Sequence, residues 1–316
     1  MTTIGSAERR RWGIALAVFL TSSACIAAPR KNGFLLEPSS VPTREIRRGG
    51  PSRAEIPALV HPPSVSADEA PWDDDVRVIG VVVGGKARAY PVSMLVRHEL
   101  VNDLLGGKPI LISYCPLCGT GIVYYRRVDG KLYYFAVSGL LYRSDLLMYD
   151  LETESLWSQI GAEALVGSLL GSRLAWMPSK LDSWGRWKQR HPETTILQRD
   201  VGMKMDYRKD PYREYVRSRE IREPVKWDRR YHPKLWTLGA RLPDGSARAY
   251  PSSEVEAAGG AVAEQFSGVE IRVAYGKALR AFAIEAPEGV EYIQGYWFAW
   301  SAFHPDTTVY TAPEED

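Results

Sequence analysis

The sequence has only three cysteines and almost no net charge over its 316 residues. Because Cys25, Cys115 and Cys118 cannot form a disulfide framework, an apolar core must hold the fold together. Forty basic residues against thirty-eight acidic ones leave a net charge of +2, which argues against a nucleic-acid binder with a broad basic surface. Small-molecule or metal ligands are therefore the expected partners.

The N-terminus also lacks an apolar run of the roughly 20 residues that cross a bilayer. Three arginines at 9–11 precede a short apolar stretch, and small residues follow up to Ala28, which is typical of a secretory signal. We therefore expect residues 1–28 to direct export to the periplasm or cell envelope. The tripeptide ending at Cys25 resembles a lipobox, so a lipoprotein acylated at Cys25 is the alternative to cleavage after Ala28. That lipid or signal anchor is the only expected membrane contact.

Alternating and β-branched runs dominate the rest of the chain. Residues 29–70 are rich in Pro, Ser and Arg and are expected to be an extended lead-in. Residues 76–91 predict a hairpin around a Gly-Gly turn, and further strands are expected on both sides of Cys115 and Cys118. Residues 92–104 are spaced for a short helix carrying His98 and Glu99. The predicted fold class is α+β, β-dominated and mostly antiparallel.

Three ordered correspondences indicate an internal repeat. Residues 247–251 repeat 87–91 letter for letter, 273–276 match 112–115 at nearly the same offset, and 297–307 echo 184–194. We infer two related β-rich units from an internal duplication. The first unit is residues 71–198, a polar connecting segment with several aromatics is 199–234, and a shorter second unit is 235–316.

The second copy lacks the chemistry of the first. Gly276 stands where the first copy has Cys115, and neither Cys118 nor residues 138–157 have a counterpart. Since shared residues are better explained as scaffold, the first unit is expected to carry the functional site. The same argument assigns His191 and His304, which occur in both copies, a structural role.

The turn at residues 113–121 contains the candidate site. In Cys-Pro-x-Cys-Gly the spacing lets both sulfurs face one point, and the glycine can adopt a left-handed conformation, as in a metal knuckle. A single knuckle excludes a closed four-cysteine site within one chain. A mixed site remains, in which Cys115 and Cys118 are joined by His98, Met148, Asp145 or water. Such ligands suit copper or zinc.

Two other hypotheses stay open for the same turn. Cys-x-x-Cys is the usual spacing of thiol–disulfide oxidoreductases, although a β-like run rather than a helix follows Cys118. The cysteines could instead be structural, in a non-enzymatic binding module of the cell envelope. If the site is catalytic, Glu99 or Asp145 is the expected acid–base group. The sequence does not name a reaction or decide whether the protein is an enzyme.

Several long motifs resemble the DUF3179 family, a bacterial and archaeal family named as a domain of unknown function. The resemblance covers roughly residues 50 to 310 and is based on blocks at 87–91, 98–103, 114–120, 138–150, 155–159 and 210–212. Arg97 departs from the family pattern, which tends to have Trp before the histidine. The resemblance implies the fold and the position of the site but no reaction.

Overall fold

The computed structural model describes residues 1–2 and 28–313. Residues 3–27, which hold most of the predicted signal and Cys25, lie outside them, as do residues 314–316. Strands make up 41% of the structure and helices 12%, and the small sheets are mostly antiparallel. The expected β-dominated fold is therefore confirmed. Within the described residues, no helix combines the length and apolarity needed to span a membrane.

Three five-stranded sheets and two helices form the main part of the first unit and its lead-in. The first sheet consists of β17 (Trp176–Met177), β10 (Thr120–Tyr125), β9 (Lys108–Cys115), β8 (Leu100–Leu105) and β4 (Leu59–Val60). The second consists of β16 (Glu163–Val166), β15 (Leu156–Ser158), β14 (Asp145–Asp150), β13 (Phe135–Tyr142) and β3 (Ile46–Arg48). The third consists of β18 (Lys180–Ser183), β6 (Arg77–Val83), β7 (Lys86–Pro91), β19 (Thr195–Leu197) and β5 (Ser64–Ser66). The helices are α1 (Val92–His98) and α2 (Trp184–Arg190).

The lead-in at residues 29–70 adds short extended pieces to these sheets. Its strands β3, β4 and β5 each form one sheet edge. It also contains the hairpin β1 (Arg30–Lys31) and β2 (Phe34–Leu35) and the 3-10 turn η1 (Thr43–Glu45), and a second small hairpin lies further along at β11 (Arg127–Val128) and β12 (Lys131–Leu132). Because Phe34, Leu36 and Ile46 are buried, the lead-in belongs to the packed fold.

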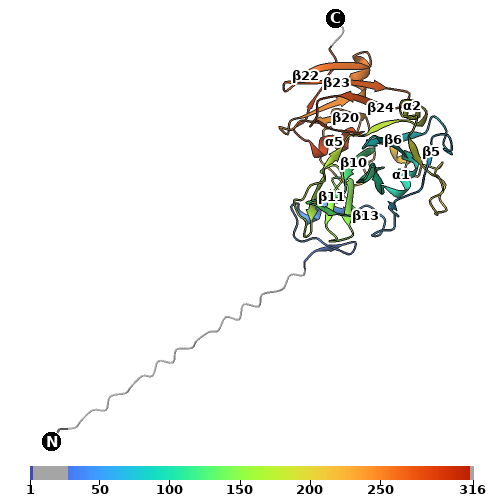
Figure 1. Ribbon diagram of the computed structural model, residues 1–316. Coiled ribbons are helices and arrows are strands. Elements are labelled where there is room, and N and C mark those ends of the chain that lie inside the picture. The colour runs from blue at the N-terminus through green and yellow to red at the C-terminus, as the bar shows by residue number, and fades with distance from the viewer. Residues whose placement is uncertain (3–27, 314–316) are drawn as a thin grey trace.

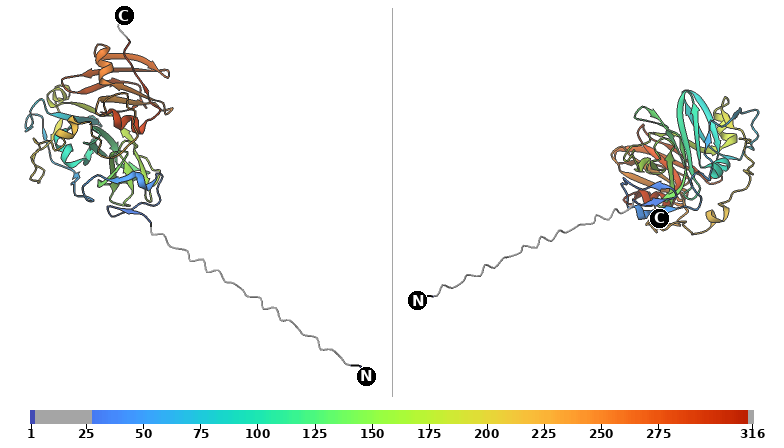
Figure 2. Two further views of the ribbon diagram at one scale, coloured as in Figure 1. Left: turned by 180° about the vertical axis from the view of Figure 1, so that it is seen from behind. Right: turned by 90° about the horizontal axis from the view of Figure 1, so that it is seen from below.

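The second unit contains two further sheets. One consists of β25 (Glu291–Tyr296), β20 (Trp236–Arg241), β21 (Ala247–Pro251) and β26 (Thr308–Val309), and the other of β22 (Ala261–Phe266), β23 (Val269–Gly276) and β24 (Ala281–Glu285). Its helices are α4 (Ser252–Ala257) and α5 (Trp297–Phe303), while α3 (Arg213–Arg217) belongs to the connecting segment. The orange and red second unit lies at the opposite end of the molecule from β11 and β13 (Figure 1). The same separation is visible from behind (Figure 2).

The two units share one strand arrangement. In the first, β7 pairs antiparallel with β6 and parallel with β19, and in the second β21 pairs antiparallel with β20 and parallel with β26. A Cβ on Gly80 would lie 2.3 Å from the Trp187 ring, and one on Gly239 would lie 2.1 Å from the Trp300 ring. Both tryptophans therefore pack directly on a glycine of the neighbouring strand, where only glycine leaves room.

The expected helix at residues 92–104 is only half correct. Helix α1 ends at His98, and Glu99 adopts a φ of +58° that no α-helix contains. Residues 100–105 instead form β8, which pairs with β9 across a tight Gly106-Gly107 turn with positive φ at both glycines. Such a two-residue turn favours a hairpin, and the strand pairing that it creates overrides the helical spacing.

Candidate metal centre

The cysteine turn connects β9 to β10 as a compact knuckle. The backbone N–H groups of Cys118 and Gly119 both donate to the carbonyl of Cys115, at 3.2 and 2.8 Å. Gly119 has a φ of +68°, the left-handed conformation that the sequence predicts there. Cys115 and Cys118 are buried and are not joined by a disulfide. The turn therefore presents two free thiols to the protein interior.

A second hairpin brings a carboxylate to these thiols. The turn between β13 and β14 places Arg143 and Ser144 at φ values of +53° and +65°, so that Asp145 begins β14 directly beside the knuckle. The Cys118 thiol donates to the Ser144 carbonyl, with Sγ and O 3.4 Å apart. Ligand atoms of Cys115, Cys118 and Asp145 all lie within 4.8 Å of one another. Asp145, 27 positions beyond Cys118 in the sequence, thus converges with the two cysteines on one buried point.

One carboxylate oxygen of Asp145 accepts a hydrogen bond and the other does not. Its Oδ2 accepts a hydrogen bond from the Ile160 backbone N–H at 3.0 Å, whereas its buried Oδ1 has no hydrogen-bond partner among the described residues. No ion pair within residues 28–313 involves this carboxylate. A buried acceptor without a partner costs free energy, and a proton or a cation at Oδ1 would remove that cost.

Burial shifts every acidic group of the site in the same direction. It raises the pKa of Asp145 to about 7 and, together with the charge of Asp145, raises the pKa of Glu99 to about 8. Burial also raises the pKa of both thiols. Because a reactive redox thiol requires a lowered pKa, these shifts do not favour the thiol–disulfide hypothesis. A metal cation at these ligands would have to displace their protons.

His98 is not part of the cluster. Its Nδ1 lies 2.8 Å from the Pro57 carbonyl and its Nε2 lies 2.7 Å from the Tyr207 hydroxyl. Since a carbonyl only accepts, Nδ1 donates and Nε2 accepts from the tyrosine. Burial lowers the pKa of His98 and keeps the ring neutral, although the Pro57 carbonyl opposes this shift. Both ring nitrogens are thus used to hold the lead-in and the connecting segment, and the expectation of His98 as a ligand has no support in this geometry.

Glu99 and Met148, the other residues expected at the site, have different positions. The charge of Glu99 acts on Cys115, and its backbone carbonyl accepts from the Tyr114 N–H at 2.7 Å. Glu99 therefore lies close to the cluster and about 7% exposed, nearer to solvent than the cysteines. Met148 is fully buried in the same apolar core as both cysteines, opposite Val137 and Trp157. Its role as a ligand stays a prediction.

The connecting segment contributes two tyrosines that the sequence did not single out as site residues. The Tyr215 hydroxyl donates to the Leu117 carbonyl inside the cysteine turn at 3.1 Å. Burial raises the pKa of both phenols, and nearby acidic groups add to the shift, Glu99 for Tyr212 and Cys118 for Tyr215. The Lys234 ammonium donates to the Tyr215 carbonyl and, at 3.1 Å, to that of Ser218. In the sequence, the aromatic residues of this otherwise polar segment were the signal that could have pointed to these tyrosines. The segment covers the cysteine turn.

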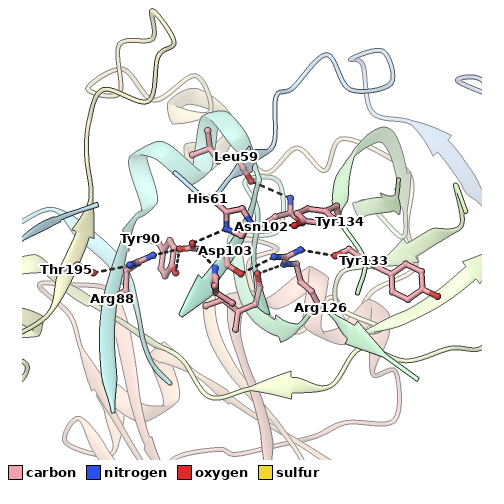
Figure 3. A network of polar contacts seen from close by, with 12 residues as sticks. Leu59, His61, Arg88, Tyr90, Asn102, Asp103, Arg126, Tyr133, Tyr134 and Thr195 are labelled. Atoms are coloured by element: carbon pink, nitrogen blue, oxygen red, sulfur yellow. Dashed lines mark hydrogen bonds and ion pairs between the residues drawn. The ribbon is translucent and has the colours of Figure 1, made fainter. Parts of the chain in front are cut away.

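The block at residues 98–103 is partly structural. Asp103 is buried and accepts from Arg88 and from the Tyr90 hydroxyl, each at 2.8 Å (Figure 3). Asn102 donates to the Phe135 carbonyl at 2.8 Å and so joins β8 to β13. In the second unit Arg248 and Glu264 form the corresponding pair at 2.8 Å. These polar residues therefore stabilise the scaffold around the site.

These observations define a class: a β-rich protein with two buried thiols and a buried carboxylate gathered at one point. The chain belongs to the family described as "Protein of unknown function (DUF3179)", whose model matches residues 53–288. The match includes every residue of the cluster, and it confirms the resemblance found in the motifs. No curated protein and no solved structure matches the chain.

Proposed function

We propose that this protein binds a transition metal, zinc or copper, through Cys115, Cys118 and Asp145. The observation that carries the proposal is the convergence of three buried acidic ligands, one of which has an oxygen without a partner. Without a cation, all three groups must keep their protons in an apolar core. A bound metal replaces these protons and pairs with all three groups at once, because thiolate and carboxylate bind metals in their deprotonated form.

The ligand types narrow the choice of metal. Two thiolates suit zinc and copper, and a carboxylate as third ligand favours zinc over Cu(I). Three protein ligands leave one of the four tetrahedral positions of zinc open. Glu99 is the nearby acidic group that could occupy this position or accept a proton from a bound water.

Metal analysis of protein purified without a histidine tag tests the proposal. We expect about one zinc or copper per chain, and loss of that metal in the Cys115→Ser and Asp145→Asn variants. Asp150→Asn is the matched control, because Asp150 is equally buried in the same strand but bonds to Trp157. Wild-type protein that holds no stoichiometric metal after incubation with zinc or Cu(I) would overturn the proposal.

We also propose that the protein is exported to the periplasm or cell envelope. The support is the pattern of residues 1–28, with its basic head, short apolar stretch and small residues up to Ala28. Mass spectrometry of protein isolated from its native host should find a chain beginning at Pro29, or a lipid on Cys25. A cytosolic chain that retains Met1 would contradict export.

We further propose that the two units derive from an internal duplication. The support is the shared order of strand pairing and the two equivalent tryptophans, whose indole N–H groups each donate to a threonine seven residues later, at 2.9 and 3.0 Å. On this proposal the hairpin that carries Asp145 is an addition specific to the first unit.

A further inference from the structure

A cleft of about 370 Å³ lies between the first and second units. One wall comes from the β13–β14 turn and the β15–β16 hairpin of the first unit, and the other from β20, β25 and the end of α5. Its lining combines arginines with aromatic rings, including Tyr142, Arg143, Arg241, Trp300, Phe303 and His304. The volume is that of a site for a small organic molecule.

Arg143 is the cation in this cleft that lacks a carboxylate partner. The other two arginines are paired, Arg173 with Glu163 at 2.7 Å and Arg241 with Glu291 at 3.1 Å. No ion pair in the described part of the chain includes Arg143, which donates instead to the Ala302 carbonyl at 2.7 Å. Three arginines against two glutamates leave the lining with one excess positive charge.

Aromatic side chains hold Arg143 in place. Its guanidinium lies 5.2 Å from the Tyr142 ring centre and 5.6 Å from that of Phe303, so the planar group is oriented by cation–π contacts. Its backbone φ of +53° is rare for a residue other than Gly, Asn or Asp. The turn therefore accepts backbone strain at the residue that presents a charge to the cleft.

His304 lines the cleft beside the Arg143 guanidinium with an uncharged ring. Its ring stacks on Trp300 with centroids 3.9 Å apart. Burial and then the charges of Arg241 and Arg143 lower its pKa to about 4. At neutral pH the imidazole is thus a polar, uncharged surface next to the guanidinium.

We propose that this cleft binds a small organic anion with a planar apolar body, its carboxylate or phosphate on Arg143 and its body against the aromatic wall. Arginine matches both anionic groups with paired hydrogen bonds. Anion binding in this cleft is a separate function from metal binding and does not depend on it. The walls of the cleft nevertheless adjoin the cysteine site. Ile160 lines the cleft and donates to Asp145, and Arg143 precedes the carbonyl that accepts from Cys118.

Isothermal titration calorimetry with matched probes tests the inference. Benzoate and phenyl phosphate share a ring and differ in the anionic group, while benzamide has nearly the shape of benzoate without its charge. We expect untagged protein to bind at least one of the anions and to bind benzamide about ten-fold more weakly or worse. The comparison of the two anions tells whether the site prefers carboxylate or phosphate.

Substitutions of Arg143 test whether this residue binds the anion. Arg143→Asn suits the left-handed backbone and should weaken anion binding about ten-fold or more. Arg280→Asn is the matched control, because Arg280 has a φ of +51° and lies outside the cleft, and it should leave binding unchanged. Arg143→Lys keeps the charge and the packing but loses the planar fork, so an intermediate loss is expected even if the asparagine variant folds poorly.

Two results would overturn the inference: no binding of either anion, or equal binding by Arg143→Lys, Arg143→Asn and wild-type protein. Calorimetry reads anion binding and elemental analysis reads metal content, both in wild-type protein. The inference and the metal proposal therefore fail separately.

Discussion

Glu99 and Asp145 are the side chains whose ionisation decides how the candidate metal centre responds to pH. Both are acids whose pKa in the folded protein, about 8 and about 7, lies above the ordinary values of 4.5 and 3.8. The folded state therefore binds protons that the unfolded state releases. By linkage, the stability that these groups provide is present at low pH and is lost as the pH rises toward their folded pKa values.

This sign leads to a prediction for Glu99→Gln in the metal-free protein. The variant buries no charge at this position, so its free energy of unfolding should rise relative to wild type as the pH increases from 5 to 8, by about 3–4 kcal/mol in total. Urea unfolding at a series of pH values measures the difference. The exposed control Glu193→Gln should show no such trend, and a constant difference between Glu99→Gln and wild type would show that Glu99 keeps its ordinary pKa.

At the scale of elements, the cysteine turn is held from outside as well as by its own backbone. A Cβ on Gly119 would lie 2.8 Å from the Trp236 ring and 3.1 Å from that of Tyr296. The Tyr296 backbone N–H also donates to the Cys118 carbonyl at 2.8 Å. The conformation of the turn therefore depends on packing against β20 and β25.

Gly119→Ala should accordingly destabilise the protein and weaken metal binding. Backbone strain and the clash with Trp236 act together, and the expected loss is about 2–4 kcal/mol in the free energy of unfolding. Gly130→Ala is the control, since Gly130 has a φ of +78° and open space around its Cα, so only the strain remains. Thermal unfolding measures both losses. Equal losses in Gly119→Ala and Gly130→Ala would contradict the packing argument.

The elements around the site also show what local sequence can and cannot predict. The Gly-containing knuckle and the hairpins next to it follow from turn chemistry, and all of them are present. Residues 100–104 were expected to be helical because apolar spacing fits a short helix, but the Gly106-Gly107 turn and the pairing with β9 decide in favour of a strand. His98 was expected at the metal because imidazole suits zinc or copper and because it lies in one of the family-like motifs, yet partners 41 and 109 positions away occupy its ring.

At the scale of the whole molecule, the second unit supports a site whose ligands all come from the first. The apolar core that contains Cys115 and Cys118 continues through Trp236 and Tyr296. A Cβ on Gly295 would lie 2.6 Å from the Thr120 side chain and 3.0 Å from the Cys118 carbonyl. The second unit thus serves as a wall of the candidate metal centre.

Gly295→Ala tests this dependence across the molecule. The added methyl should displace the knuckle and reduce metal affinity at least about ten-fold, because Thr120 is buried and bonded to Gln159 and cannot move freely. Gly276→Ala is the matched change in the same unit, where the nearest atom is an ordinary 3.7 Å away. Equal metal affinities of the two variants would show that the second unit does not shape the site.

Comparing the matching motifs in the sequence pointed to the segments of the candidate metal centre but not to its full set of ligands. Comparing the copies singled out Cys115, Cys118 and residues 138–157, and the structure places Asp145 of that segment beside both thiols. That contact depends on a turn in which Arg143 and Ser144 adopt left-handed conformations, which neither residue type indicates. Long-range packing of this kind leaves no local pattern.

The most direct test of the metal centre is X-ray absorption at the K-edge of the bound metal in untagged protein. Ligation by Cys115, Cys118 and Asp145 predicts two sulfur neighbours at about 2.3 Å, with oxygen at about 2.0–2.2 Å and no imidazole signal. A spectrum with no sulfur neighbour, or with the outer-shell pattern of a histidine ring, would contradict the site described by these residues.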